Sequence, residues 1–366
     1  MIYLDYNATA PLHPVARAAM EALAGAPLNP SSVHAGGRQA KKLLEDARAT
    51  IAQSLSAFPN EVLFTASATE ANNMVLRAFA AERALIVSAI EHPSIGKTGA
   101  LLGADVLPVG ANGLVRLDLL ESKLAALDGR KALLSIMLAN NETGVIQPIA
   151  EIVTIARKYG ALVHSDAVQA LGKITLDWGL LGVDMLTISG HKAGGPVGGA
   201  ALLIRNDLPI KPLLTGGAQE LGRRAGTVNI PAIVGFAAVV KEVAAAPQAA
   251  QWAEWRDWLQ TELKGGIAYS AAAPRLANTL AISMPGVRSD TQLMNFDLAG
   301  FAVSAGSACS SGRIEPSPVL LAMGISAEQA QSAIRISFGW ATTKAEIEQF
   351  AKAWNEAANR LVKQAA

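Results

Sequence analysis

Apolar and polar positions follow two different patterns along the chain. Short apolar runs recur between longer segments in which apolar residues have helical spacing. The short runs predict strands that are buried on both faces, and the longer segments predict amphipathic helices. Strands are expected at residues 62–65, 84–87, 132–136, 161–164, 185–188 and 200–204. Strands of this type separated by helices indicate a largely parallel sheet in an α/β domain.

The pattern changes in the last third of the chain. Helices are expected at residues 15–23, 38–55 and 230–243, after which the sequence becomes Ala-rich up to Pro247. A helix with three tryptophans follows, then strands at 279–283, 301–303 and 334–338 and an amphipathic helix at 344–362. We therefore expect a large domain over residues 14–251, and a small α+β domain made of residues 1–13 and 252–366.

Length and charge narrow the class of protein. A chain of 366 residues is long enough for two lobes, because single cores stop growing near about 250–300 residues. A net charge of +1 without a basic run argues against a nucleic-acid partner. No stretch reaches about 18 consecutive apolar residues, and the N-terminus lacks the basic region of a signal peptide. We expect a soluble cytoplasmic protein that does not bind a membrane.

The chain has one cysteine, Cys309, so an intrachain disulfide is excluded. A single cysteine is usually an inert core residue. Serine, glycine and alanine surround this one on both sides, which favours a mobile polar loop and an accessible nucleophile.

The polar stretch Ser189-Gly190-His191-Lys192 ends an apolar run and leads into a glycine-rich segment. A lysine in this position is well placed to lose water, which lowers the pKa of an amine and lets it form a Schiff base. A solvated loop lysine is the alternative for this stretch alone.

Two other strand ends offer groups for a phosphate and a ring nitrogen. Residues 66–73 open a helix, where free N–H groups and the Thr69 hydroxyl can bind a phosphate; Ser67 and Glu70 also fit a plain capping box. Asp166 can pair with a protonated pyridine nitrogen or cap a helix.

Two further strand ends add an imidazole and an amide. His92 can stack on a planar cofactor and exchange protons near neutral pH, or it can be structural. Asn141 belongs to the polar segment 140–144. Because five strand ends carry such groups, we expect one shared site.

Taken in order, these motifs resemble the NifS/IscS-type cysteine desulfurases, pyridoxal-phosphate (PLP) enzymes of the class V aminotransferase group. The resemblance covers nearly the whole chain. The motifs that carry it are Tyr3-Leu4-Asp5, residues 29–34, residues 68–73, Glu91-His92, residues 140–142, Asp166-Ala167-Val168-Gln169, residues 189–192, residues 222–227, and Gly306-Ser307-Ala308-Cys309-Ser310-Ser311.

The resemblance implies a fold and a set of roles. The fold would be a fold-type I PLP-dependent transferase, with a mostly parallel seven-stranded sheet in the large domain and the catalytic cysteine loop in the small one. Lys192 would bind the cofactor covalently, while His92 would stack on its ring. The remaining cofactor residues would be Asp166 at the pyridine nitrogen, Gln169 at the ring hydroxyl, Ala68, Thr69, Ser189 and His191 at the phosphate, and Asn141, Val168 and Gly190 nearby.

The implied enzyme is a homodimer in which Thr227 reaches the phosphate bound by the partner subunit. Arg335, with Asn141, would bind the carboxylate of L-cysteine; an edge-strand arginine is the alternative. Lys192 would remove the Cα proton, and the Cys309 thiolate would attack the substrate sulfur. The products would be L-alanine and a persulfide that passes to a sulfur acceptor or an iron–sulfur scaffold protein. No metal is expected.

Three departures from the family pattern matter. Ala66 and Ser67 stand where the family usually has serine and glycine, so Ser67 must tolerate a backbone position often given to glycine. Val197 stands in place of a second lysine, and the chain stops at Ala366 soon after its last helix, which leaves the sulfur acceptor open.

Two other functions remain open. One is a selenocysteine lyase or a class V aminotransferase on the same scaffold; an aminotransferase has no need of Cys309. The other is a catalytically silent subunit that binds partners. A silent subunit is expected to have lost Lys192 or Cys309, and this chain has both.

Overall fold

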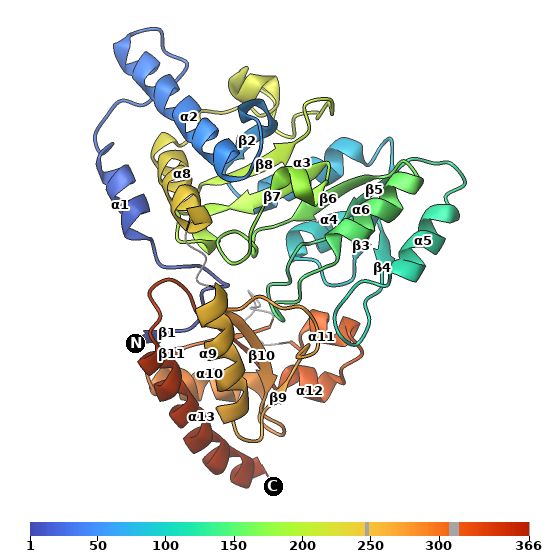
Figure 1. Ribbon diagram of the computed structural model, residues 1–366, viewed down its shortest axis with the longest axis vertical. Coiled ribbons are helices and arrows are strands. Elements are labelled where there is room, and N and C mark those ends of the chain that lie inside the picture. Colours follow the sequence, from blue (N-terminus) through green and yellow to red (C-terminus); the bar gives the residue numbers. More distant parts are fainter. Residues whose placement is uncertain (246–248, 307–314, 366) are drawn as a thin grey trace.

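The computed structural model describes residues 1–245, 249–306 and 315–365, which form two domains (Figure 1). The large domain is built on a seven-stranded sheet with the strand order β2-β8-β7-β6-β5-β3-β4. The strands β7, β6, β5, β3 and β4 run parallel to one another, whereas β8 is antiparallel to both of its neighbours, β7 and β2. The predicted fold class, a mostly parallel seven-stranded sheet beside a smaller α+β lobe, is confirmed.

The strands of this sheet are β2 (Val62–Thr65), β3 (Ala84–Ser88), β4 (Asp105–Leu107), β5 (Ala132–Ser135), β6 (Leu162–Asp166), β7 (Met185–Ser189) and β8 (Ala200–Ile204). The helices of the large domain are α1 (Pro14–Glu21), α2 (Ala35–Ser54), α3 (Ala68–Phe79), α4 (Pro93–Leu101), α5 (Leu117–Ala125), α6 (Ile149–Lys158), α7 (Trp178–Leu181) and α8 (Ile230–Ala245). Short 3-10 turns lie at η1 (Pro59–Glu61), η2 (Gly190–Lys192) and η3 (Gln219–Gly222).

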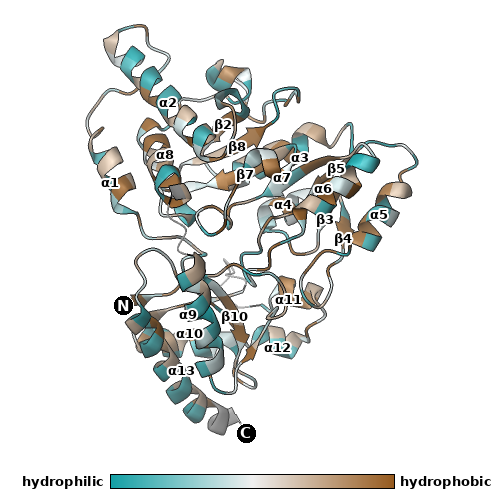
Figure 2. Ribbon diagram, in the orientation of Figure 1, coloured by the Kyte–Doolittle hydropathy of each residue, from teal (hydrophilic) through white to brown (hydrophobic). Residues whose placement is uncertain are grey.

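Side chains of the central strands pack into two hydrophobic cores, one on each face of the sheet. In β8, Ala201 and Leu203 belong to one core, and Leu202 and Ile204 belong to the other. Every residue of β8 is buried, which explains why the strand is a continuous apolar run. Figure 2 shows the apolar strands between the helices. The edge strand β4 was not predicted, because two of its three residues are exposed and it has no apolar run.

The small domain contains a four-stranded antiparallel sheet with the order β12-β13-β10-β9. Its strands are β9 (Ile267–Ala268), β10 (Thr279–Ser283), β12 (Ser304–Ala305) and β13 (Ala333–Ser337), and β1 (Ile2–Tyr3) pairs separately with β11 (Phe301–Ala302). Its helices are α9 (Ala249–Glu262), α10 (Ser289–Leu298), α11 (Pro318–Ala322), α12 (Ala327–Gln331) and α13 (Lys344–Ala365). In place of the single strand expected at 301–303, the structure has the two short strands β11 and β12, which pair with β1 and β13, respectively.

The N-terminal residues join this small domain. Leu4 lies in its hydrophobic core together with Phe296, Phe350 and Trp354. The assignment of residues 1–13 to the small domain and the domain boundary near residue 251 stay predictions. No single helix among the described residues has both the length and the apolar character needed to cross a membrane. Taken together, the bent pair of α8 and α9 is long and apolar enough, by length and composition only.

A buried ion pair ties α2 to the segment after β8. Arg48 donates to both carboxylate oxygens of Glu220, at 2.8 and 2.9 Å, and the two side chains are 8% and 1% exposed. Glu220 also accepts the backbone N–H of Phe64 in β2 at 2.9 Å. Glu220 and Leu221 have φ of 48° and 58°, so this pair holds a left-handed turn that these residue types disfavour.

We expect Arg48→Met to lower the free energy of unfolding by about 3–5 kcal/mol, because it leaves a buried carboxylate without its counter-ion. Chemical denaturation measures this change. Lys42→Met, which removes an exposed pair with Asp46, is the control and should cost less than about 1 kcal/mol. Equal losses for the two variants would contradict this account of the turn.

Candidate active site

A cavity of about 460 Å³ lies between the two domains, where β6 and β7 end. It is lined by residues from both, including Lys192 from the large domain and Arg335 from the small one. The predicted site residues that line it are Ala68, Thr69, His92, Asn141, Asp166, Val168, Gln169, His191, Lys192 and Arg335.

Three predicted site residues of the described structure do not line this cavity, and a fourth lies outside the described part of the chain. Ser189 and Gly190 are buried just before His191. Thr227 is exposed, and its predicted role concerns a second subunit. Cys309 belongs to residues 307–314, outside the described part of the chain, so its role stays a prediction.

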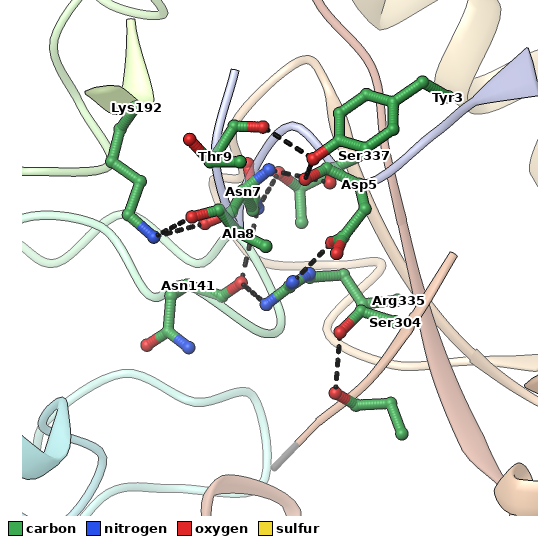
Figure 3. Close-up of polar contacts among 12 residues, drawn as sticks. Tyr3, Asp5, Asn7, Ala8, Thr9, Asn141, Lys192, Ser304, Arg335 and Ser337 are labelled. Carbon is green, nitrogen blue, oxygen red and sulfur yellow. Dashed lines mark hydrogen bonds and ion pairs between the residues drawn. The ribbon is translucent and has the colours of Figure 1, made fainter. Parts of the chain in front are cut away.

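Lys192 projects toward the N-terminal segment, which we define as residues 3–9 (Figure 3). Its Nζ donates to the backbone oxygens of Asn7 and Ala8, both at 2.7 Å. Burial and, to a lesser extent, the charge of Arg335 lower the pKa of Lys192, Asp5 and Asp166 oppose the shift, and the result is a pKa of about 8. A larger fraction of this amine is therefore neutral at physiological pH than of a solvated lysine, as a nucleophilic or basic lysine requires.

The loop after Lys192 needs glycine for two reasons. Gly194 has φ of +95°, a left-handed conformation that favours glycine. A Cβ on Gly199 would lie 2.9 Å from the backbone oxygen of Ala232 in α8. The loop therefore packs closely on α8 and fixes the position of η2, which carries the lysine.

Asp166 ends β6 and is 6% exposed. Its carboxylate accepts Asn72 Nδ2 at 2.7 Å and the backbone N–H of Val168 at 3.0 Å. Burial raises the pKa of Asp166, and these two hydrogen bonds oppose the rise. The residues that follow form turns and not a regular helix, so the helix-cap alternative does not hold.

A chain of hydrogen bonds joins Asp166 to His92. The Asn72 amide that binds Asp166 also donates to Ser94 Oγ at 2.9 Å. Ser94 Oγ lies 2.9 Å from His92 Nδ1, and the Ser94 N–H donates to the same atom at 3.2 Å. Because Nδ1 accepts a backbone N–H, the proton of the neutral ring is on Nε2. Burial lowers the pKa of His92, which favours this neutral form.

The start of α3 offers free donors to the cavity. Ser67 caps the helix by accepting the N–H of Glu70 at 3.2 Å, and no acceptor for the N–H groups of Ala68 and Thr69 is found among the described residues. Ser67 has φ of −161°, an extended conformation open to any residue, so the strain expected at this position is absent. The capping interaction and a phosphate site are thus compatible.

Arg335 lies in β13, which pairs with a strand on each side. The edge-strand alternative is therefore wrong. Arg335 Nη2 forms an ion pair with Asp5 Oδ1 at 2.7 Å, and Nη1 donates to the backbone oxygen of Asn141 at 3.0 Å (Figure 3). Its Nε is buried and has no hydrogen-bond partner in the described structure. The guanidinium keeps donors for a carboxylate ligand.

These groups fit PLP. The free N–H groups of α3 suit its phosphate, Asp166 suits its ring nitrogen, and Lys192 suits its aldehyde. The cavity is large enough to hold a small cofactor together with an amino acid.

Three residues beside the site were missed as site residues by sequence analysis. Asn7 supplies the oxygen that Lys192 binds, and Lys173 is buried behind Gln169. Glu91 lines the cavity, and burial raises its pKa to about 8. The available signals were weak: Asn7 stands two positions after Asp5, and Lys173 stands four after Gln169.

The chain matches known proteins over almost its whole length. A family model described as Aminotransferase class-V matches residues 2–350. An IscS-like cysteine desulfurase of Mycobacterium tuberculosis is 38% identical, with 95% of this chain and 94% of that protein covered. The solved structure of a NifS-like protein from Rickettsia africae has a TM-score of 0.92 at 38% identity, covering 98% of this chain and 99% of that one. A structure described as SspA in complex with cysteine has a TM-score of 0.82 at 32% identity, covering 92% and 99%.

The reactivity of Lys192 should titrate near pH 8. Competitive labelling of the apoprotein with acetic anhydride, followed by peptide mass spectrometry, measures the neutral fraction of the amine as pH rises. The same lysine in the denatured chain should titrate near about 10.4 and is the control. Asp5→Asn should move the native midpoint below that of the wild type, because Asp5 raises the pKa of Lys192. A native midpoint near 10, or an upward shift in Asp5→Asn, would refute this electrostatic account.

Proposed function

Since the chain belongs to the aminotransferase class-V family, we propose that it is a PLP-dependent cysteine desulfurase that converts L-cysteine to L-alanine and leaves the sulfur as a persulfide on Cys309. The observation that carries the proposal is Lys192, a half-buried lysine with a pKa of about 8, in one cavity with Asp166, His92 and Arg335. Relatives described as cysteine desulfurases match 95–99% of the chain at 38–39% identity.

The residues at the large-domain side of the cavity would hold the cofactor. The N–H groups of Ala68 and Thr69 would donate to its phosphate, and His92 would lie over its ring. Asp166 would hold a proton at the ring nitrogen, and burial makes its carboxylate a stronger base for this purpose. Bound PLP supplies an electron sink for the pair of electrons released at Cα.

Two residues would act on the amino acid directly. The Arg335 guanidinium would bind the substrate carboxylate through the Nη hydrogens that Asp5 and Asn141 do not use. The neutral Nζ of Lys192 would take the Cα proton, which is a task for a base with a pKa near the working pH.

Sulfur transfer needs no added oxidant. The Cys309 thiolate would attack the substrate sulfur, an S–S bond would form, and the Cβ–S bond would break. The electron pair of the broken bond stays with the carbon, and Cβ then gains a proton to become the methyl group of alanine. The sulfur loses two electrons, and the carbon gains the same two.

The wider setting of the reaction is also part of the proposal. The persulfide would pass to a sulfur acceptor or an iron–sulfur scaffold protein. A single cysteine and no basic run fit a cytoplasmic protein without a nucleic-acid partner. A homodimer would bring Thr227 to the phosphate site of the partner subunit. Arg224, which is close to Thr227 in sequence, forms an ion pair with Glu70 at the start of α3, at 2.7 Å. The segment that contains Thr227 therefore lies near the end of the site that would bind the phosphate.

Cys309→Ser should still bind L-cysteine, as seen in a change of the cofactor absorption, and should release almost no alanine. Hydroxyl oxygen is a far weaker nucleophile toward sulfur than a thiolate. Brief exposure of the wild type to L-cysteine should add about 32 Da per sulfur to the peptide with Cys309. Ser310→Ala, which alters the same segment, is the control and should keep the adduct.

The same measurements distinguish the alternatives. Alanine release by Cys309→Ser at the wild-type rate, without any adduct on the wild type, would favour an aminotransferase or a lyase. Turnover of selenocysteine alone by this variant would place that activity outside the Cys309 route. No alanine from the wild type, with normal folding and cofactor uptake, would indicate a silent binding subunit.

Cofactor binding and dimerisation should be linked. If Thr227 completes the phosphate site of the partner subunit, PLP binds the dimer more tightly and stabilises it by mass action. Analytical ultracentrifugation of the apoprotein should show a shift toward dimer when PLP is added, and Thr227→Val should weaken that shift. A PLP-saturated monomer at micromolar concentration would rule out a shared site.

A further inference from the structure

Lys173 is a buried lysine for which the proposed reaction has no role. It lies seven residues after the end of β6 and is 5% exposed. No carboxylate lies within ion-pair distance of it in the described structure. Its Nζ instead contacts two amide oxygens, Asn7 Oδ1 at 2.7 Å and Gln169 Oε1 at 2.5 Å. Both amides belong to the site.

A backbone carbonyl, which can only accept a hydrogen bond, identifies the nitrogen end of each amide. Gln169 Nε2 donates to the backbone oxygen of Asn7 at 2.9 Å, so Oε1 must be the end that meets Lys173. Asn7 Nδ2 donates to the backbone oxygen of Asn141 at 3.3 Å and to Thr279 Oγ1 at 2.9 Å, so its Oδ1 also faces Lys173. Lys173 is therefore the donor in both contacts.

The contacts of Lys173 connect it with Lys192 and with the part of the cavity that would hold the cofactor. The backbone oxygen of Asn7 that accepts Gln169 Nε2 also accepts Lys192 Nζ, as Figure 3 shows for Lys192. Gln169 lines the cavity, and its Nε2 has two hydrogens. One goes to Asn7, which leaves the other for a ligand.

We propose that Lys173 is a positioning residue that keeps the amide nitrogen of Gln169, and not its oxygen, turned toward the cofactor, and that holds Asn7 where it accepts Lys192. The inference rests on the proposed function, because it assigns the second N–H of Gln169 to the ring oxygen of PLP. Lys173 supplies this effect even as a neutral amine, whose two hydrogens match the two amide oxygens. Burial lowers the pKa of Lys173, and the charges of Lys192 and Arg335, the ionisable groups that face it, lower it further.

The test uses the holoenzyme, with Lys173→Met, which keeps the length of the side chain and removes both donors. Without Lys173 the Gln169 amide can rotate and present its oxygen to the ring oxygen. We expect PLP affinity to fall about tenfold, as for a lost buried hydrogen bond. We also expect the pH midpoint of the cofactor absorption change to rise, because a donor at the ring oxygen favours its deprotonated form.

A double-mutant comparison shows whether Lys173 acts through Gln169. Gln169→Leu should raise the absorption midpoint by itself, and adding Lys173→Met should raise it no further. Leu176→Ala, a buried change in the same segment, controls for lost stability and should leave the midpoint unchanged. Should Lys173→Met fail to fold, Lys173→Leu, a smaller apolar side chain that also lacks a donor, should give the same shift.

An unshifted midpoint in a folded Lys173 variant, with a shifted one in Gln169→Leu, would overturn the inference. So would additive shifts in the double variant. A wild-type chain that folds but takes up no PLP would instead refute the proposed function, and this inference with it.

Discussion

Three basic side chains lie around one cavity, of which Lys173 and Arg335 are buried and Lys192 is half-buried, and the rest of the site depends on their hydrogen-bond acceptors. The N-terminal segment accepts hydrogen bonds from all of them: Asn7 from Lys173 and Lys192, and Asp5 from Arg335. Buried cations without such acceptors would lose much of their solvation free energy without compensation. The segment therefore has to cross from the small domain to the large one, as it does in Figure 1.

This arrangement links fold and chemistry. Burial and the charge of Arg335 lower the pKa of Lys192 to about 8, so that more of the amine is neutral than in a solvated lysine, as a base or nucleophile needs, while Asp5 and Asp166 limit the shift. A shallower site would leave the lysine solvated and protonated. Close packing of the glycine loop on α8 keeps the lysine at this depth, and pairing on both sides of β13 does the same for Arg335.

Much of the fold could be predicted because the central strands are apolar on both faces; β2 and β8 begin and end where the pattern placed them. The edge strand β4 was not predicted, because an exposed strand has no continuous run of apolar residues. Lys192, Asp166 and His92 could be found because each lies at or shortly after the end of a strand. Lys173 and Asn7 could not, because their burial and partners arise only when the N-terminal segment packs across the site. Cys309 lies outside the described residues, and its role stays a prediction from its neighbours in sequence.

The central claim is that the depth and contacts of Lys192 make it the amine that holds PLP, although Lys173 is buried nearby. Reduction of the holoenzyme with borohydride fixes the cofactor to the amine that carries it, and peptide mass spectrometry then locates the label. The account predicts a label on the peptide with Lys192 and none on the peptide with Lys173. A label on Lys173 or on an exposed lysine, or no label on a holoenzyme that absorbs as a PLP protein, would contradict it.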